Sequence, residues 1–313
     1  MTRMIARRMV AAAGILVLVS FAVFVMIASV PGDPAAILAG ENATPEQVAE
    51  LRSHLGLDQP LVERYLSWLG HALQGDLGNS LRSGEAITSA LASPIAVTTA
   101  LVTVTIVLST VLGLAMGIVA VTAKWRWVDR VISAVSALGI AVPSFWAGLI
   151  LVSVLAVSHN WFPAVGYVPL WEDPGQWIMH LILPSIALGT LPAAEIALQV
   201  RDSMATELRR DYVQVARAKG LSESVIIARH VLKNAAIPVL TVFGYRAGQL
   251  VGGAIAVEVV FALPGLGQIA VTSTLTRDVN MLLGMVVVTT VAVVVINLLV
   301  DISYGYFNPK VRS

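Results

Sequence analysis

Residues 211 to 238 read DYVQVARAKGLSESVIIARHVLKNAAIP, a basic and amphipathic stretch in a chain that is otherwise mostly apolar. The pattern predicts two short helices around Gly220, because glycine readily takes the left-handed conformation that ends a helix. Ser222 is a suitable N-cap for the second helix. Ala216, Ala218 and Gly220 carry almost no side chain. We therefore expect this turn to fit a groove of a partner outside the membrane.

A membrane helix is expected to begin at Pro238, since proline is tolerated in the first turn of a helix. The basic stretch would then form a hinge joined to a spanning helix. Such a hinge transmits a partner's movement to the part of the chain inside the membrane.

The composition identifies a membrane protein with several spans. Of the 313 residues, 57% are hydrophobic and 12% are charged, and the mean hydropathy is +0.82, well outside the range of soluble globular proteins. The chain has no cysteine, which excludes disulfides, thiolate metal sites and cysteine nucleophiles. The first apolar run, from about residue 9 to 30, is too long for the core of a signal peptide and is expected to be a retained span.

Six apolar segments are long enough to cross a bilayer, which requires about 20 residues. An even number of spans places both termini on one side. The termini and the loops at 123–130 and 201–235 hold 15 of the 20 basic residues, so the positive-inside rule places both termini and these loops in the cytoplasm. The six segments are residues 9–30, 95–122, 131–157, 177–200, 236–257 and 281–303.

The segment 31–94 is long, acidic and expected to be helical on the outer face. Thr44 and Gln47 have the spacing of a capping box, with Pro45 at the first helical position, and Gly56 is a suitable stop. A second helix is indicated by an apolar stripe at a spacing of four residues. The alternative is a solvated loop whose apolar residues lie on the bilayer surface. The stripe consists of Leu61, Tyr65, Leu69 and Leu73.

The chain lacks the common motifs of catalysis. It contains no Gly-Lys pair, which a phosphate-binding loop requires, and no His-Glu-x-x-His or Gly-x-Ser-x-Gly motif. We expect no catalytic residues, no metal site and no cofactor bound by this chain. An intramembrane enzyme would need a catalytic pair that the sequence does not offer.

Polar residues inside the expected spans are candidates for a transport path, because an ionisable group at the bilayer centre costs at least about 2.5 kcal/mol and normally faces a cavity or a partner. Arg246 and Gln249 are three residues apart and share a helix face, while Glu195 lies in the fourth span. The alternative is that these side chains bind one another or a partner subunit and hold helices together. Gln199, Glu258, Asn297 and Asp301 are the other polar residues of this kind.

Five stretches, in order along almost the whole chain, resemble the permease subunits of bacterial ABC importers, and within them the B-type permease of dipeptide, oligopeptide and nickel systems. The resemblance implies an all-α type I importer permease with a MetI-like core and six transmembrane helices. It divides the chain into residues 1–30, an extracytoplasmic segment 31–94, a core 95–303 with the coupling loop 201–235, and a tail 304–313. The stretches are VPGDP at 30–34, LGLDQPL at 55–61, GDLGNS at 75–80, ARAKGLSE at 216–223 and VFALPGLG at 260–267.

In this family a cytoplasmic Glu-Ala-Ala motif followed by a glycine docks in a groove of the ATPase subunit. The equivalent positions resemble Gln214, Val215 and Ala216, with Gly220 matching the glycine. Gln214 departs from the pattern and removes a carboxylate. A DNA-binding helix-turn-helix has a similar outline, but the neighbouring spans argue against it, and no nucleic acid is expected. The resemblance implies coupling through Gln214, Ala216, Arg217, Ala218, Gly220, Leu221, Ser222 and Glu223.

The resemblance also implies the partners and the location: a second related permease, two cytoplasmic ATPase subunits that bind ATP and Mg, an extracytoplasmic substrate-binding lipoprotein and the lipid of the bacterial inner membrane. The expected function is the import of di- or oligopeptides. Nickel chelates, glutathione and haem-like ligands remain alternative cargoes. The rival class is a self-sufficient secondary transporter or channel, which would need no docking hinge and often shows inverted repeats.

Overall fold

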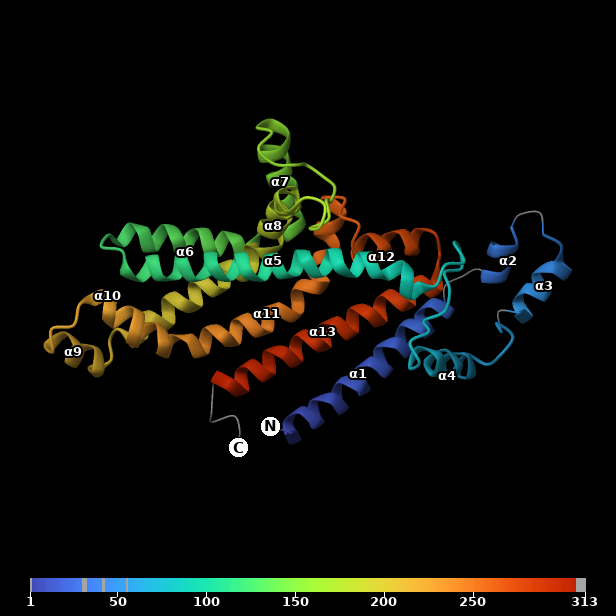
Figure 1. The fold of residues 1–313 in the computed structure, drawn as a ribbon, viewed down its shortest axis with the longest axis horizontal. Coiled ribbons are helices and arrows are strands. Elements are labelled where there is room, and N and C mark those ends of the chain that lie inside the picture. Colours follow the sequence, from blue (N-terminus) through green and yellow to red (C-terminus); the bar gives the residue numbers. More distant parts are fainter. Residues whose placement is uncertain (1, 30–32, 41–42, 55, 308–313) are drawn as a thin grey trace. The chain divides into compact units, whose positions relative to one another are not determined.

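The computed structural model describes residues 2–29, 33–40, 43–54 and 56–307, and in these ranges the chain is helical apart from loops and one isolated antiparallel bridge between Asn79 and Ala86. The expected all-α class is confirmed (Figure 1). The elements are α1 (Thr2–Ala28), α2 (Pro34–Ala39), α3 (Pro45–His54), α4 (Leu61–Ala72), α5 (Ile87–Thr122), α6 (Arg126–Ala141), α7 (Ser144–Leu151), the π-helix η1 (Val152–Ser158), α8 (Pro174–Glu207), α9 (Asp211–Ala218), α10 (Glu223–Val225), the π-helix η2 (Ile226–Val231), α11 (Leu232–Val260), α12 (Leu266–Leu275) and α13 (Val279–Phe307).

Four helices in the described part are long and apolar enough to cross a membrane. They lie in α1, α5, α8 and α13, and they coincide with four of the six predicted spans. The bent pair α6 and α7–η1 is a fifth candidate. The predicted span 236–257 falls within the single helix α11, of which the stretch Gly248–Val260 is apolar. The chain is therefore a multi-pass membrane protein.

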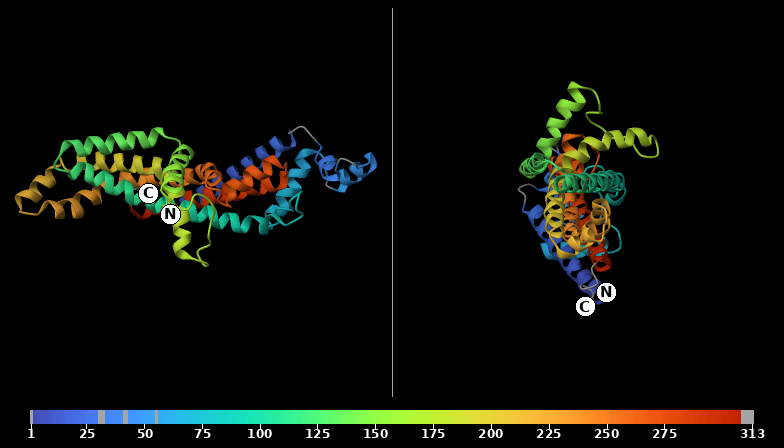
Figure 2. Two further views of the ribbon diagram at one scale, coloured as in Figure 1. Left: turned by 90° about the horizontal axis from the view of Figure 1, so that it is seen from above. Right: turned by 90° about the vertical axis from the view of Figure 1, so that its left-hand side faces the viewer.

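The predicted span 131–157 is not one straight helix. Helices α6 and α7–η1 meet at an angle of 109°. Val142 is extended, with φ −86° and ψ 122°, because the ring of Pro143 disfavours helical backbone in the residue before it. Figures 1 and 2 both show α7 projecting away from α6.

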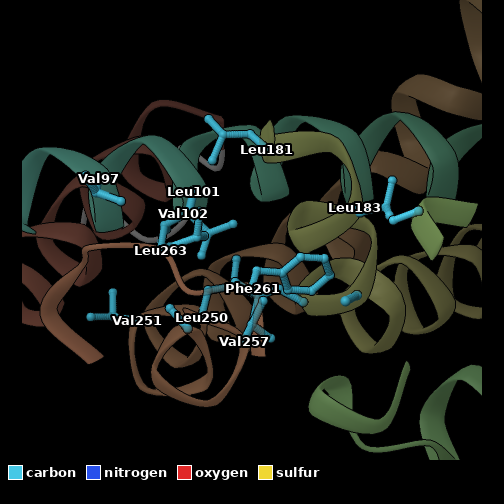
Figure 3. Close-up of a cluster of buried hydrophobic side chains, with 14 residues drawn as sticks. Val97, Leu101, Val102, Leu181, Leu183, Leu250, Val251, Val257, Phe261 and Leu263 are labelled. Carbon is cyan, nitrogen blue, oxygen red and sulfur yellow. The ribbon is translucent and has the colours of Figure 1, made fainter. Parts of the chain in front are cut away.

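The described residues divide into two compact units, each with its own core: residues 97–264 with 293–307, and residues 2–96 with 265–292. In the first unit α8 packs against α6, α7 and α11. Its largest cluster of buried side chains surrounds Phe261 and Leu183 (Figure 3).

Small residues allow close helix packing in this unit. A Cβ at Gly117 of α5 would lie 2.6 Å from the Cβ of Val200 and 2.7 Å from the carbonyl oxygen of Ala197 on α8. Gly113, one turn earlier, meets Ile196 in the same way. Two glycines four residues apart are a common contact surface between membrane helices.

In the second unit, α4 packs on α1 through Tyr65. Its hydroxyl donates to the carbonyl oxygen of Val17 at 3.0 Å and shares a hydrogen bond of 2.9 Å with Ser20. The ring meets Phe21 edge to face, with centroids 5.0 Å apart. The predicted apolar stripe is therefore a helix face, except that Leu73 lies beyond the end of α4.

The predicted capping box at the start of α3 is confirmed. The backbone N–H of Thr44 donates to Oε1 of Gln47 at 2.9 Å, and the N–H of Gln47 donates to Oγ1 of Thr44 at 3.4 Å. Gly56 follows α3 with φ +63°. The segment after α1 is thus built from defined helices.

Asp278 connects the loop at 75–80 to the start of α13, a contact that the sequence reasoning missed. Its carboxylate accepts hydrogen bonds from Ser80 Oγ (2.5 Å) and the N–H of Leu81 (3.2 Å). It also accepts from the N–H of Met281 (3.2 Å), which makes Asp278 the N-cap of α13. The sequence signal that could have predicted this N-cap was an aspartate immediately before a long apolar run.

Candidate coupling and transport site

The basic stretch folds as the predicted turn between two helices, which we call the elbow (residues 211–225). Helix α9 ends at Ala218, and Gly220 has φ +78°. The N–H of Leu221 donates to the carbonyl oxygen of Ala216 at 3.2 Å, closing a glycine-dependent helix end. Residues with a Cβ rarely adopt this conformation.

An ion pair spans the elbow. Arg217 donates from Nε to Oε1 of Glu223 at 2.6 Å and from Nη2 to Oε2 at 3.2 Å. Both side chains are about half exposed, and the guanidinium lowers the pKa of the Glu223 carboxyl. Two of the predicted coupling residues therefore fix the two sides of the turn to each other.

The elbow presents most of the predicted coupling residues to solvent, but not Ala216. Ala216 is only 8% exposed and packs in a cluster with Val213, Ile226 and Val231. Residues 213 and 216 are three apart and share the inner face of α9, so Ala216 packs inside the elbow, and its role as a docking contact stays a prediction. The exposed members are Gln214, Arg217, Ala218, Gly220, Leu221, Ser222 and Glu223.

The second elbow helix continues directly into the membrane helix. Ser222 occupies the N-cap position, although its hydroxyl contacts Ser224 Oγ at 3.2 Å and makes no capping bond. From Glu223 the chain is helical without a break through α10, η2 and α11 to Val260. The expectation that Pro238 begins a helix is wrong, because α11 already starts at Leu232. Between α10 and α11 the helix has π geometry over η2, Ile226–Val231.

The three predicted path residues lie together between α8 and α11. Nε and Nη2 of Arg246 donate to the two carboxylate oxygens of Glu195, and Nη1 donates to Oε1 of Gln249 at 2.5 Å. The guanidinium also lies 5.2 Å from the ring centroid of Tyr245. Arg246 and Glu195 are 19% and 22% exposed, so the pair lies at the edge of the packed helices.

The other polar residues of the expected spans have separate environments. Glu258 is fully buried, and its Oε1 accepts from Thr98 Oγ1 at 2.6 Å. Gln199 donates to Ser203 Oγ at 3.0 Å. A Cβ at Gly248 would lie 2.6 Å from Oδ1 of Asn297, so α11 and α13 approach closely there. The side chain of Asp301 lies outside the described residues.

A further ion pair, which the sequence reasoning missed, joins α6 to α8. Arg201 at the end of α8 donates to both carboxylate oxygens of Asp129 on α6, at 2.5 and 2.8 Å. Arg201 also donates to Asp202 at 2.8 Å. We call the pair of Asp129 and Arg201 the clamp, because it holds α6 to the helix that precedes the elbow. The sequence signal for it was a pair of opposite charges at the ends of two expected spans.

Comparison with known families gives two matches that together cover almost the whole chain. Residues 109–313 match the inner membrane component of binding-protein-dependent transport systems, and residues 1–102 match the N-terminal part of such a membrane component.

Similar curated proteins have related descriptions. A putative peptide transport system permease protein of Brucella abortus (strain 2308) is 36% identical over 312 residues, which is 100% of this chain and 99% of that protein. A probable peptide ABC transporter permease protein of Sinorhizobium fredii is 35% identical over 98% of both chains. The glutathione transport system permease protein of Escherichia coli O6:H1 is 37% identical over 95% of this chain and 94% of that protein.

Proposed function

The chain belongs to the family of inner membrane components of binding-protein-dependent transport systems, and we propose that, with a second related permease, it forms the path for di- or oligopeptides. It is a permease subunit of an ABC importer. Relatives are named for peptide and glutathione transport, and glutathione is itself a tripeptide. This supports a peptide as the cargo, delivered by an extracytoplasmic binding protein.

The proposed topology has six spans with both termini in the cytoplasm of a bacterial cell. The distribution of Lys and Arg supports it, because most of them lie in the termini and in the two loops assigned to the cytoplasm. In this arrangement α6 with α7–η1 is one bent span, α11 is another, and the segment 31–94 faces outward. That segment would contact the binding protein or the second permease.

The elbow is the proposed docking site for an ATPase subunit. Two such subunits would bind ATP and Mg, so this chain contributes a path and a lever without hydrolysing nucleotide. The observation that carries this proposal is the unbroken helix from Glu223 at the exposed elbow to Val260, with Arg246 along it. A displacement of the elbow is therefore a displacement of α11, and the bundle changes between two states that ligands bias.

The pair Glu195 and Arg246, with Gln249, is the proposed polar part of the path wall. A peptide carries an ammonium and a carboxylate group, and the pair offers the opposite charge to each. The alternative is that the pair only holds α8 to α11. A role in the path wall requires each charge at its own position. A role in holding the two helices together requires only that the two charges attract each other.

Uptake by reconstituted vesicles tests the function. Proteoliposomes with the complete importer and the binding protein are expected to accumulate peptide only when ATP is supplied. Proteoliposomes that contain this chain alone are expected to show no flux. Peptide flux through the chain alone, driven by an ion gradient, would instead establish the secondary transporter or channel.

A further inference from the structure

Two exposed tryptophans lie where the α5–α6 connection enters α6: Trp125 is the N-cap of α6, and Trp127 lies in its first turn. Trp125 and Trp127 stack with centroids 6.3 Å apart and an angle of 19° between the rings, and they are 67% and 58% exposed. Stacking holds both indoles on one surface of the turn. Large amphipathic rings of this kind are enriched where a membrane meets water.

Three exposed cations surround the indoles: Lys124, Arg126 and Arg130. Within the described part of the chain, none of the three forms an ion pair. The carboxylate beside these cations, Asp129 in the first turn of α6, accepts hydrogen bonds from Arg201 through both oxygens. The turn therefore presents positive charge and aromatic surface together. We call Lys124, Trp125, Arg126, Trp127 and Arg130 the tryptophan turn.

We infer that the tryptophan turn binds the phosphate headgroup of an anionic phospholipid in the membrane leaflet that faces the elbow. The ammonium and guanidinium groups match a phosphodiester in charge and hydrogen bonding. The indoles match the boundary between headgroup and acyl chain. The turn joins two helices that are candidate membrane spans, so it lies where headgroups are found. A lipid is favoured over an acidic protein surface because the exposed indoles offer apolar area next to two candidate spans, at the depth where acyl chains begin.

The lipid would act on the part of the permease that moves. The clamp between Asp129 and Arg201 joins α6 to α8 near the end of α8, and α9 begins at Asp211, ten residues after Arg201. Figures 1 and 2 show the α5–α6 turn and the elbow at the same end of this unit. A bound headgroup would fix the helix ends from which the elbow extends. This role, unlike the binding itself, rests on the proposed function.

Lipid retention on the purified full-length chain tests the binding without any need for transport. The chain is purified with mixed phosphatidylglycerol and phosphatidylcholine, and retained lipids are counted by native mass spectrometry. The unmodified chain is expected to retain phosphatidylglycerol preferentially. Each surface charge contributes roughly fivefold to binding at an anionic membrane. The triple variant Lys124→Gln, Arg126→Gln, Arg130→Gln is therefore expected to lose the preference, by a factor on the order of 100.

Two control variants keep the result specific. The conservative triple Lys124→Arg, Arg126→Lys, Arg130→Lys is expected to retain the lipid. A charge-matched triple elsewhere, Arg209→Gln, Arg229→Gln, Lys233→Gln, removes exposed cations that are not beside the indoles and is expected to change lipid retention little.

Equal loss of lipid retention in both glutamine triples would overturn the site, as would no loss in either. In the complete importer, unchanged lipid retention by the first glutamine triple together with lost co-purification of the ATPase subunits would overturn the lipid site and identify a protein contact instead. Displacement by soluble glycerophosphoglycerol would also contradict a site that needs the acyl boundary.

Discussion

Gly220→Val is expected to abolish most ATP-driven uptake while the importer remains assembled in the membrane. Gly220 has φ +78°, and a Cβ there would meet nothing within 4 Å. The effect of valine is therefore backbone strain and not a clash, with a cost of about 1–3 kcal/mol for a non-glycine residue in such a conformation. The turn would relax to another shape and move the exposed surface that docks the ATPase.

Two measurements on the same preparation check this expectation: peptide uptake and ATP hydrolysis in proteoliposomes of the complete importer. Uptake should fall severalfold or more, while hydrolysis persists without being linked to transport. The matched control is Gly84→Val, which places the same side chain at φ +71° with equally open space, but far from the elbow in sequence. Full uptake in Gly220→Val, with normal hydrolysis, would show that the turn's shape does not matter.

The second large effect is expected at the ion pair between α8 and α11. Arg246→Leu leaves the partly buried Glu195 carboxylate without its main partner, which weakens the contact between α8 and α11. The single variant is expected to lose uptake, but this result does not distinguish the loss of helix packing from the loss of a charge in the path. The exchanged variant Glu195→Arg, Arg246→Glu separates them, because it keeps the attraction and reverses the charge positions.

Exchange is expected to restore co-purification with the second permease but not peptide uptake. The control is the conservative pair Asp129→Glu with Arg201→Lys, which keeps the attraction at the clamp and is expected to retain both properties. If the exchanged pair between α8 and α11 also restores uptake, these residues serve only to hold the helices together.

Local signals in the sequence predicted much of the elbow and of the outer helices. Gly220 and the Thr44 capping box depend on neighbours within a few residues, and the structure has both as expected. The common helix face of Arg246 and Gln249 follows from helical geometry in the same way. In the structure, Glu195 of α8 contacts Arg246 on that face.

Features that depend on distant packing were not predictable in this way. Ala216 is small, which suggested a docking contact, but its burial is decided by Ile226 and Val231 on the following helix. Pro238 suggested a helix start, yet the helix that includes it continues from the elbow through η2 and α11. The contacts of Asp278 with Ser80 join residues about 200 positions apart. No local pattern specifies such a pairing.

The central claim is that force from the ATPase subunits enters this chain at the elbow, and disulfide crosslinking tests it directly. The chain has no cysteine, so Leu221→Cys, at a position 41% exposed, provides a single thiol at the elbow. In the active importer, with cysteines placed in turn around the groove of an otherwise cysteine-free ATPase subunit, Leu221→Cys is predicted to form a disulfide-linked pair with that subunit. Ser83→Cys in the outer segment is predicted to form none. An importer that transports peptide with no crosslink from Leu221→Cys to any of these ATPase positions would contradict the account.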